Sequence, residues 1–290
     1  MPNAIELATS FVPVLDEVYQ NASLTANLDG AAELASQGAN ANELIIPMMD
    51  MQGLGDYSRN DGYVKGDMSL TNETVKCNYD RGRMFSVDTM DNLETAGIAF
   101  GRLAGEFIRT KVAPEVDAFR FASYAGKEGI SKVDAGTELA TGEEVIAALR
   151  VAMAKMDEDE VPVEDRHLYI TSPLHGLVKD MDTTKSREIL AEFASVTKVP
   201  QKRFYTAIDL KSGKDGEAVG GFVKNADAKD INFMIIHKPA VIQYPKHIAP
   251  KIIEPAVNQA ADGYGFGYRN VGVADVYKNK VAGIYLHHKA

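Results

Sequence analysis

Cysteine and histidine are the residues of this sequence whose chemistry is easiest to assign to a site. Cys77 is the only cysteine, so neither a disulfide within one chain nor a thiolate metal cluster can form. Its segment, TVKCNYD, has small and polar neighbours and indicates a strand, which disfavours a catalytic thiol. His287 and His288 could ligate a metal, but no third ligand lies at helical or strand spacing. We therefore expect solvated histidines near the C-terminus and no metal site.

Other patterns that could bind a ligand lack the spacing that their chemistry needs. The run GYGFG, at 263–267, has aromatic residues between the glycines and no helix after it, unlike a dinucleotide-binding loop. The acidic run at 157–160 has no glycine turn or calcium-loop spacing, which favours a solvated loop. No phosphate-binding loop, nucleophile elbow or HExxH motif occurs. The sequence thus predicts no catalytic activity and no cofactor. Structural roles are expected for the scattered histidines His167, His175, His237 and His247.

Length and composition indicate an ordinary globular protein. The 290 residues suffice for one large domain or two smaller ones, with 45% apolar and 25% charged residues. The 41 acidic and 31 basic residues give a formal charge of −10, which argues against a module that reads DNA. There is no apolar run of membrane-spanning length and no basic start of a secretory signal. We expect a soluble, intracellular protein that does not enter a membrane.

The first part of the chain contains two segments that lack enough apolar residues to bury their own surface. Residues 1–42 have the composition of a loosely packed arm, rich in alanine, asparagine, serine and glycine. After it, 43–49 and 68–87 have the pattern of strands, and the polar segment 50–67 between them contains the turn signal NDG. Together they predict a long two-stranded ribbon with a polar tip. Because such a ribbon is only marginally stable alone, we expect it to rest on something outside its own core.

A long amphipathic helix follows, from Asp88 or Thr89 to about residue 124. Apolar residues recur along it at the spacing that is typical of a face packed on a core. Pro114 should kink or split the helix, because proline lacks the amide hydrogen that the helix interior needs. The residues of the expected core face are Leu93, Phe100, Leu103, Phe107, Val112 and Phe119.

Strands and helices alternate from about 140 to 242, which predicts a compact α/β domain. Its first helix has a capping box, with Thr141 as the N-cap and Glu144 three residues later. The pair Ser172-Pro173 is typical of an N-cap followed by the first helical residue. The expected strands are 166–171 and 233–236, and a further helix is expected at 186–196. The tail of the chain, from 241, again has the pattern of strands.

The order of these segments resembles the coat-protein fold of tailed bacteriophages that is named after phage Hong Kong 97. Four stretches are similar to coat proteins of phages that infect Gram-positive bacteria: KVAPEVDAFRFASYA (111–125), HLYITSPLHGLVKD (167–180), MIIHKPAVIQYPKH (234–247) and YRNVGVADVYKNKVAGIYLHH (268–288). The resemblance covers nearly the whole chain and implies an α+β fold class.

The resemblance also implies how the chain is divided and where subunits meet. The expected parts are an N-terminal arm (1–42), an extended β-ribbon loop with flanking strands (43–80), a peripheral domain with the long helix as its spine (81–135 and 243–270) and an α/β axial domain (136–242 and 271–290). In this family the extended loop lies across a neighbouring subunit. Contacts between subunits are therefore expected in the loop and at its base, at Asp56, Tyr57, Arg59, Asp61, Lys65, Asp67, Arg81 and Arg83.

By resemblance, the expected function is that of a major capsid protein, which builds an icosahedral or prolate head shell from pentamers and hexamers of itself. The shell encloses double-stranded DNA without sequence-specific binding, and it is assembled in the host cytoplasm and retained in the virion. A separate scaffolding protein and a portal are expected partners, together with a decoration protein in some shells. Some members of the family link subunits covalently through lysine and asparagine. Because no partner for Lys65 can be identified, noncovalent assembly is expected.

Three other functions fit parts of the sequence. An encapsulin-like compartment, which encloses cargo enzymes, shares the fold but usually has a shorter N-terminal arm. A metabolic α/β enzyme would need a convergent set of acid, base and nucleophile, which the sequence lacks. A phage tube or baseplate component is disfavoured by the long helix, because such proteins are mostly β.

Overall fold

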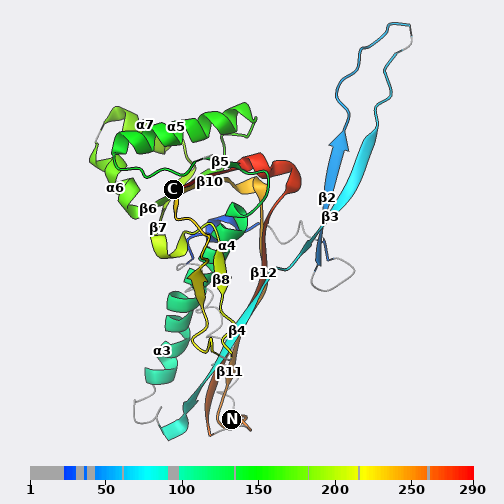
Figure 1. Ribbon diagram of the computed structural model, residues 1–290. Coiled ribbons are helices and arrows are strands. Elements are labelled where there is room, and N and C mark those ends of the chain that lie inside the picture. Colours follow the sequence, from blue (N-terminus) through cyan, green and yellow to red (C-terminus); the bar gives the residue numbers. More distant parts are fainter. Residues whose placement is uncertain are drawn as a thin grey trace.

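The computed structural model describes residues 23–30, 36–37, 43–60, 62–90, 98–133, 135–181, 183–214, 216–259 and 262–290. In these segments the strands form one sheet of five strands, two of three and one of two, and helices accompany them. This mixed architecture confirms the predicted α+β class. Figure 1 shows a body with helices gathered at one end of a long sheet and a further helix beside that sheet, and a ribbon that projects away from the body. Most of the predicted arm lies outside the described residues. None of the helices in the described segments has the length and apolar character of a membrane span.

The projecting ribbon consists of strands β2 (Glu43–Met51) and β3 (Met68–Lys76). They pair antiparallel over their whole length, with Glu43 opposite Lys76 and Met51 opposite Met68. The short strand β1 (Ser36–Gln37) pairs with β2 on its other edge. A two-stranded ribbon was predicted from strands at 43–49 and 68–87, and the structure forms it from 43–51 and 68–76.

The predicted strand at 68–87 is not continuous, because its pairing partner changes at Asn78. The Asn78 side chain donates a hydrogen bond to the Ala274 carbonyl (2.8 Å) and accepts one from the Ala274 amide (3.1 Å). After Asn78, strand β4 (Tyr79–Asp88) pairs with β12 in a different sheet. The Asn78 side chain thus takes the place of a backbone pairing with Ala274, at the point where the ribbon ends and the sheet of the body begins.

A three-stranded antiparallel sheet in the order β11-β12-β4 runs along the body (Figure 1). β12 (Gly263–Val276) lies between β4 and β11 (Val241–Ile253). The backbones of β4 and β12 approach closely at Gly82, where a Cβ atom would lie 2.9 Å from the Tyr268 carbonyl oxygen. Only glycine fits at this position without a shift of the backbone.

The long helix packs on this sheet as two α-helices, α3 (Ile98–Phe107) and α4 (Ala113–Ala125), joined by a π-helical turn at Ile108–Val112. The predicted interruption near Pro114 takes this form. The turn leaves Pro114 in the first turn of α4, where a missing amide hydrogen costs no helical bond. Of the predicted core face, Leu103, Phe107, Val112 and Phe119 pack with the sheet, whereas Leu93 and the side chain of Phe100 lie outside the described residues.

The α/β part contains a five-stranded sheet in the order β5-β13-β10-β6-β7. Its strands are β5 (Ser131–Lys132), β6 (Arg166–Thr171), β7 (Ser195–Val199), β10 (Ile231–His237) and β13 (Ile284–His288). Helices α5 (Gly142–Glu158), α6 (Ser172–Asp180) and α7 (Thr184–Ala191) cover one face, and α4 covers the other.

Alternation along β10 shows how one strand serves both faces, because successive side chains of a strand point to opposite sides. Phe233 and Ile235 pack with α5 and α6, whereas Met234 and Ile236 pack with α4. All seven residues of β10 are buried, as expected for a central strand covered on both sides.

The helix starts of the α/β part were predicted with mixed success. The capping box at Thr141 is confirmed: its side chain accepts from the Glu144 amide, and the Glu144 side chain accepts from the Thr141 amide. Ser172 is not an N-cap; Thr171 has this position, and the helix begins at Ser172. The helix predicted at 186–196 ends at Ala191, because the chain from Ser195 pairs in parallel with β6. The remaining short elements are η1 (Ala26–Leu28), η4 (Gln201–Arg203), β8 (Ile208–Leu210), β9 (Phe222–Lys224), η5 (Lys238–Ala240) and η6 (Lys278–Gly283).

Candidate functional site

The ribbon and its tip are the most exposed apolar surface of the described chain. Beyond Met51 and Met68 the two strands continue without a regular ladder, and Ser58 and Gly62 form the bridge that closes the tip. Leu54 is fully exposed at the tip, and Tyr63 is 88% exposed. Soluble proteins rarely leave such side chains clustered in water without a function. The ribbon is therefore the candidate surface for a partner.

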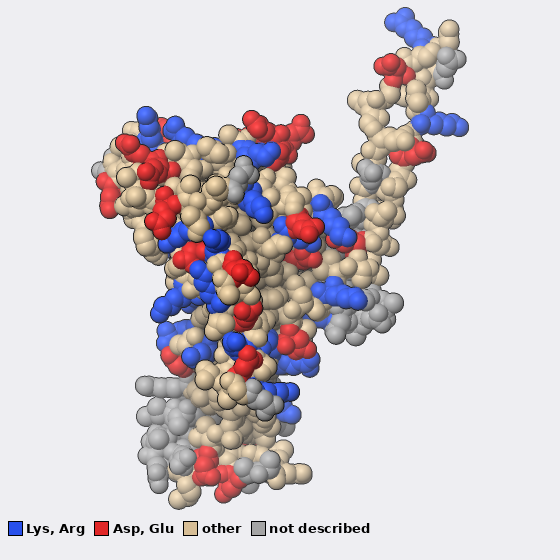
Figure 2. All heavy atoms as spheres, viewed as in Figure 1, with Lys and Arg blue, Asp and Glu red and all other residues tan. Residues whose placement is uncertain are grey.

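The charged residues predicted at the tip are exposed, as far as the structure describes them. Figure 2 shows Lys and Arg side chains interspersed with Asp and Glu along the ribbon and over this face of the body. Tyr57, also predicted as a contact, packs edge to face on Tyr63 with ring centroids 4.9 Å apart. The exposed charged residues are Asp56, Arg59, Lys65 and Asp67, whereas Asp61 lies outside the described residues.

Arg81 and Arg83, predicted as contacts at the base of the loop, lie in β4 and bind groups of their own chain. Arg81 Nε forms an ion pair with Glu115 (2.8 Å), and its Nη2 donates to the Gly221 carbonyl (3.2 Å). Arg83 Nη2 donates to the Ala218 carbonyl (2.8 Å). The two arginines thus hold the glycine-rich loop between β8 and β9 against β4. The structure does not bring them together with the tip.

A buried polar network that sequence reasoning missed holds residues 23–30, the N-terminal strap, on the body. At its centre is Asp117 of α4, whose side chain is fully buried. Its carboxylate accepts hydrogen bonds from the Ser23 and Thr25 hydroxyls (both 2.8 Å) and from Arg203 (3.1 Å). A buried carboxylate needs such partners, because an unpaired one would cost several kcal/mol, roughly 3–5.

The second half of the strap is held in the same way. Arg120 donates to the Thr25 hydroxyl (2.9 Å) and pairs with Asp29 (3.2 Å). Gln243 donates to the Thr25 carbonyl and to Asp29 (both 2.7 Å) and accepts from the Tyr124 hydroxyl (2.6 Å). Burial raises the pKa of Tyr124, so its hydroxyl remains a donor at neutral pH. The available sequence signal was the pair of charged residues, Asp117 and Arg120, on the buried side of α4.

Of the histidines predicted to be structural, His167, His175 and His237 are buried, whereas His247 is exposed. The expectation of solvated terminal histidines is wrong for His287. Its side chain is buried in β13, stacks on Phe233 with ring centroids 4.9 Å apart, and lies 3.1 Å from the Asn232 side-chain nitrogen. Burial lowers the pKa of His287 to about 4. Burial is also the main cause that lowers the pKa values of His167, His175 and His237. In the described segments no three His, Cys, Asp or Glu side chains cluster as metal ligands.

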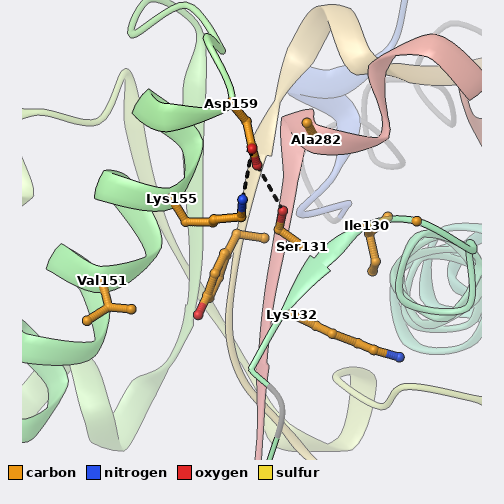
Figure 3. Close-up of a pocket in the computed structure, with 9 residues that line it drawn as sticks. Ile130, Ser131, Lys132, Val151, Lys155, Asp159 and Ala282 are labelled. Atoms are coloured by element: carbon orange, nitrogen blue, oxygen red, sulfur yellow. Dashed lines mark hydrogen bonds and ion pairs between the residues drawn. The ribbon is translucent and has the colours of Figure 1, made fainter.

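A shallow hollow between α5 and β5 is a further place where a ligand could sit (Figure 3). Lys155 Nζ and Asp159 form an ion pair (2.8 Å), and the Ser131 hydroxyl donates to the same carboxylate (3.3 Å). These polar groups satisfy one another, because the Asp159 carboxylate that accepts from Ser131 is already paired with Lys155. Cys77 lies elsewhere, at the base of the ribbon, and is partly buried.

Comparison with solved structures identifies the architecture. A structure from Mycobacterium phage Che8 superposes with a TM-score of 0.60 at 13% identity, over 91% of this chain and 90% of that chain. The capsid structure of cyanophage P-SCSP1u gives 0.56 at 12% identity, over 88% and 85%. The chain has the fold of tailed-phage capsid proteins. A virus-like particle from Pyrococcus furiosus gives 0.54 at 10% identity, over 94% and 97%. No family model matches the sequence, and no curated protein matches it.

Proposed function

We propose that this chain is a major capsid protein, which assembles with itself into the head shell of a tailed phage and encloses the double-stranded DNA genome. The observation that carries the proposal is the capsid fold, together with a ribbon whose apolar side chains its own body leaves uncovered. A subunit that must clasp its neighbours needs such a surface, because its burial becomes favourable only on association.

Rings of five or six copies require contacts in which one patch meets a different patch. In the proposed shell the ribbon lies on a neighbouring subunit, and its tip supplies charged contacts of both signs. The proposed contacts are Asp56, Tyr57, Arg59, Asp61, Lys65 and Asp67, with Arg81 and Arg83 acting at the base through the loop that they hold. The segments 81–135 and 243–270 form the peripheral domain of this proposal, and 136–242 and 271–290 form the axial domain.

The same proposal gives the chain a structural and not a catalytic role, with the virion as its location and host-cytoplasmic assembly. Scaffolding, portal and decoration proteins are its proposed partners. The net charge of −10 suits a container that encloses DNA without adhering to it. An encapsulin-like compartment for cargo enzymes is the second candidate, because the same fold matches a virus-like particle from a cellular organism, Pyrococcus furiosus.

The test is sedimentation velocity of the protein, produced alone and with the other head proteins, followed by negative-stain microscopy. Closed shells, or rings of five and six, are the expected result. Nuclease treatment of particles from infected cells separates the two candidates, because a phage head protects DNA whereas an encapsulin-like shell protects proteins. A monomer or dimer under all conditions contradicts both.

A further inference from the structure

The two faces of the ribbon differ in chemistry, and the strand register shows how. Met49 lies opposite Leu70 and Met51 opposite Met68. Residues opposite each other in an antiparallel pair, and residues two apart in one strand, have side chains on the same face. These four side chains, the methionine face, are 55%, 62%, 66% and 64% exposed in the order Met49, Leu70, Met51, Met68.

The other face of the ribbon carries Ser69 and Thr71 of β3 at its outer end, opposite Asp50 and Met48 of β2, and β3 packs on the body at the inner end. Ser69 and Thr71 are exposed on this face. Further along the same face, Glu73 and Val75 are buried, and Val75 packs with Ile242 and Val273 of the body. The body thus lies against the face that carries Glu73 and Val75. The methionine face is turned to the opposite side, where its own body cannot cover it.

We propose that the methionine face is the surface that a second copy of this chain covers, whereas the Ser69 and Thr71 side stays in solvent beyond the body. This inference rests on the proposed function, because in a shell built from one chain the molecule next to the ribbon is another copy. The surface that receives it is an apolar one, since the methionine face carries no charge. The charges of both signs at the tip then fix the direction of the ribbon.

Methionine suits such a contact. Its unbranched thioether side chain adapts to irregular surfaces at little cost. A ribbon that meets its neighbour in both fivefold and sixfold rings must fit slightly different surroundings. Three of the four residues of the methionine face are methionines.

Oxidation footprinting tests the inference directly. Hydrogen peroxide transfers one oxygen atom to the thioether sulfur, giving methionine sulfoxide and water, at a rate that depends on exposure. Free subunits and purified shells receive the same peroxide dose, with N-acetylmethionine added as an internal reference. We expect Met49, Met51 and Met68 to react readily in free subunits and at least ~10-fold more slowly in shells. Shells in which all three react as fast as in free subunits overturn the inference while leaving the proposed function intact.

A matched pair of double variants gives a second test. Met51→Gln with Met68→Gln makes the methionine face polar with little change in side-chain length. Ser69→Gln with Thr71→Gln makes the same number of changes on the opposite face. All four positions are exposed, so circular dichroism should find both proteins folded. We expect the methionine variant to raise the protein concentration needed for assembly at least ~10-fold, with the control unchanged. Equal effects, or an effect of the control alone, contradict the assignment of the face.

Discussion

Replacing Asp117 by asparagine should release the N-terminal strap while leaving the body folded. Oδ1 of the carboxylate accepts hydrogen bonds from the Ser23 hydroxyl (2.8 Å), the Thr25 hydroxyl (2.8 Å) and the Thr25 amide (3.3 Å). Oδ2 accepts from the Leu24 amide (3.0 Å) and from Arg203 (3.1 Å). Asparagine has the same shape, but one of its two terminal groups donates. In either orientation the ion pair with Arg203 is lost, and one backbone amide, that of Leu24 or that of Thr25, faces another donor.

The size of the effect follows from these contacts. A hydrogen bond to a charged group contributes about 1.5–3 kcal/mol, so the loss of two weakens the strap by roughly 3 kcal/mol or more. Removing one partner of a buried pair costs a similar amount, about 3–5 kcal/mol. Because each 1.4 kcal/mol is a factor of ten in an equilibrium constant, hydrogen exchange in the strap should accelerate at least ~100-fold.

The assay is hydrogen–deuterium exchange of the full-length protein, read by mass spectrometry on peptides that cover residues 23–30. Global unfolding is a poorer readout for this variant, because local opening of the strap can occur while the body stays folded. Asp227→Asn, at an exposed position, is the matched control and should leave exchange unchanged. Thr25→Val, which removes a single hydroxyl of the network, should have a smaller effect in the same direction. Unchanged protection of the strap in Asp117→Asn, with the fold intact, would refute the reasoning.

Three further predictions concern the body. Burial holds the pKa of His287 at about 4, below its ordinary 6.5, so the folded protein binds fewer protons than the unfolded chain between these pH values. The free energy of unfolding should therefore fall as the pH drops from 6.5 towards 4. In His287→Gln the urea midpoint should depend less on pH over this range. Gly283→Ala places a Cβ 2.5 Å from the Ala240 Cβ and should lower the free energy of unfolding by about 1–3 kcal/mol, measured as a lower melting temperature. Gly176→Ala is the control, because a Cβ there would have no atom within 4 Å. Thr141→Ala removes the N-cap of α5 and should cost about 1 kcal/mol in thermal melts, and restoration by Thr141→Ser separates capping from packing; an alanine variant as stable as the native protein contradicts the role of the cap.

Local signals in the sequence were sufficient for several elements. The capping box at Thr141 involves residues three apart, so it can be recognised without knowledge of the fold. The strands at 166–171 and 233–236 were visible as apolar runs, and β6 and β10 occupy them. The ribbon was predicted from the strand-like alternation of 43–49 and 68–87 and the turn signal between them, and the structure places β2 and β3 there.

Features that depend on distant partners were not predictable. The ribbon ends at Asn78 because its side chain bonds to Ala274, which is 196 residues away. The strap bonds to Asp117, 94 residues beyond Ser23. His287 looked solvated because it lies close to the C-terminus, but it is buried where β13 pairs with β10. Composition identified which segments lack a core of their own, whereas the strand register was needed to assign the methionine face.

The most direct test of the central claim, that this chain builds a shell by laying its ribbon on a neighbouring copy, is cryo-electron microscopy of the particles that it forms. We expect each ribbon, residues 43–76, to lie across an adjacent subunit with Met51 and Met68 in the contact and without density of a third protein between them. Particles in which the ribbon folds back on its own body, or projects into solvent without touching a neighbour, would contradict the account.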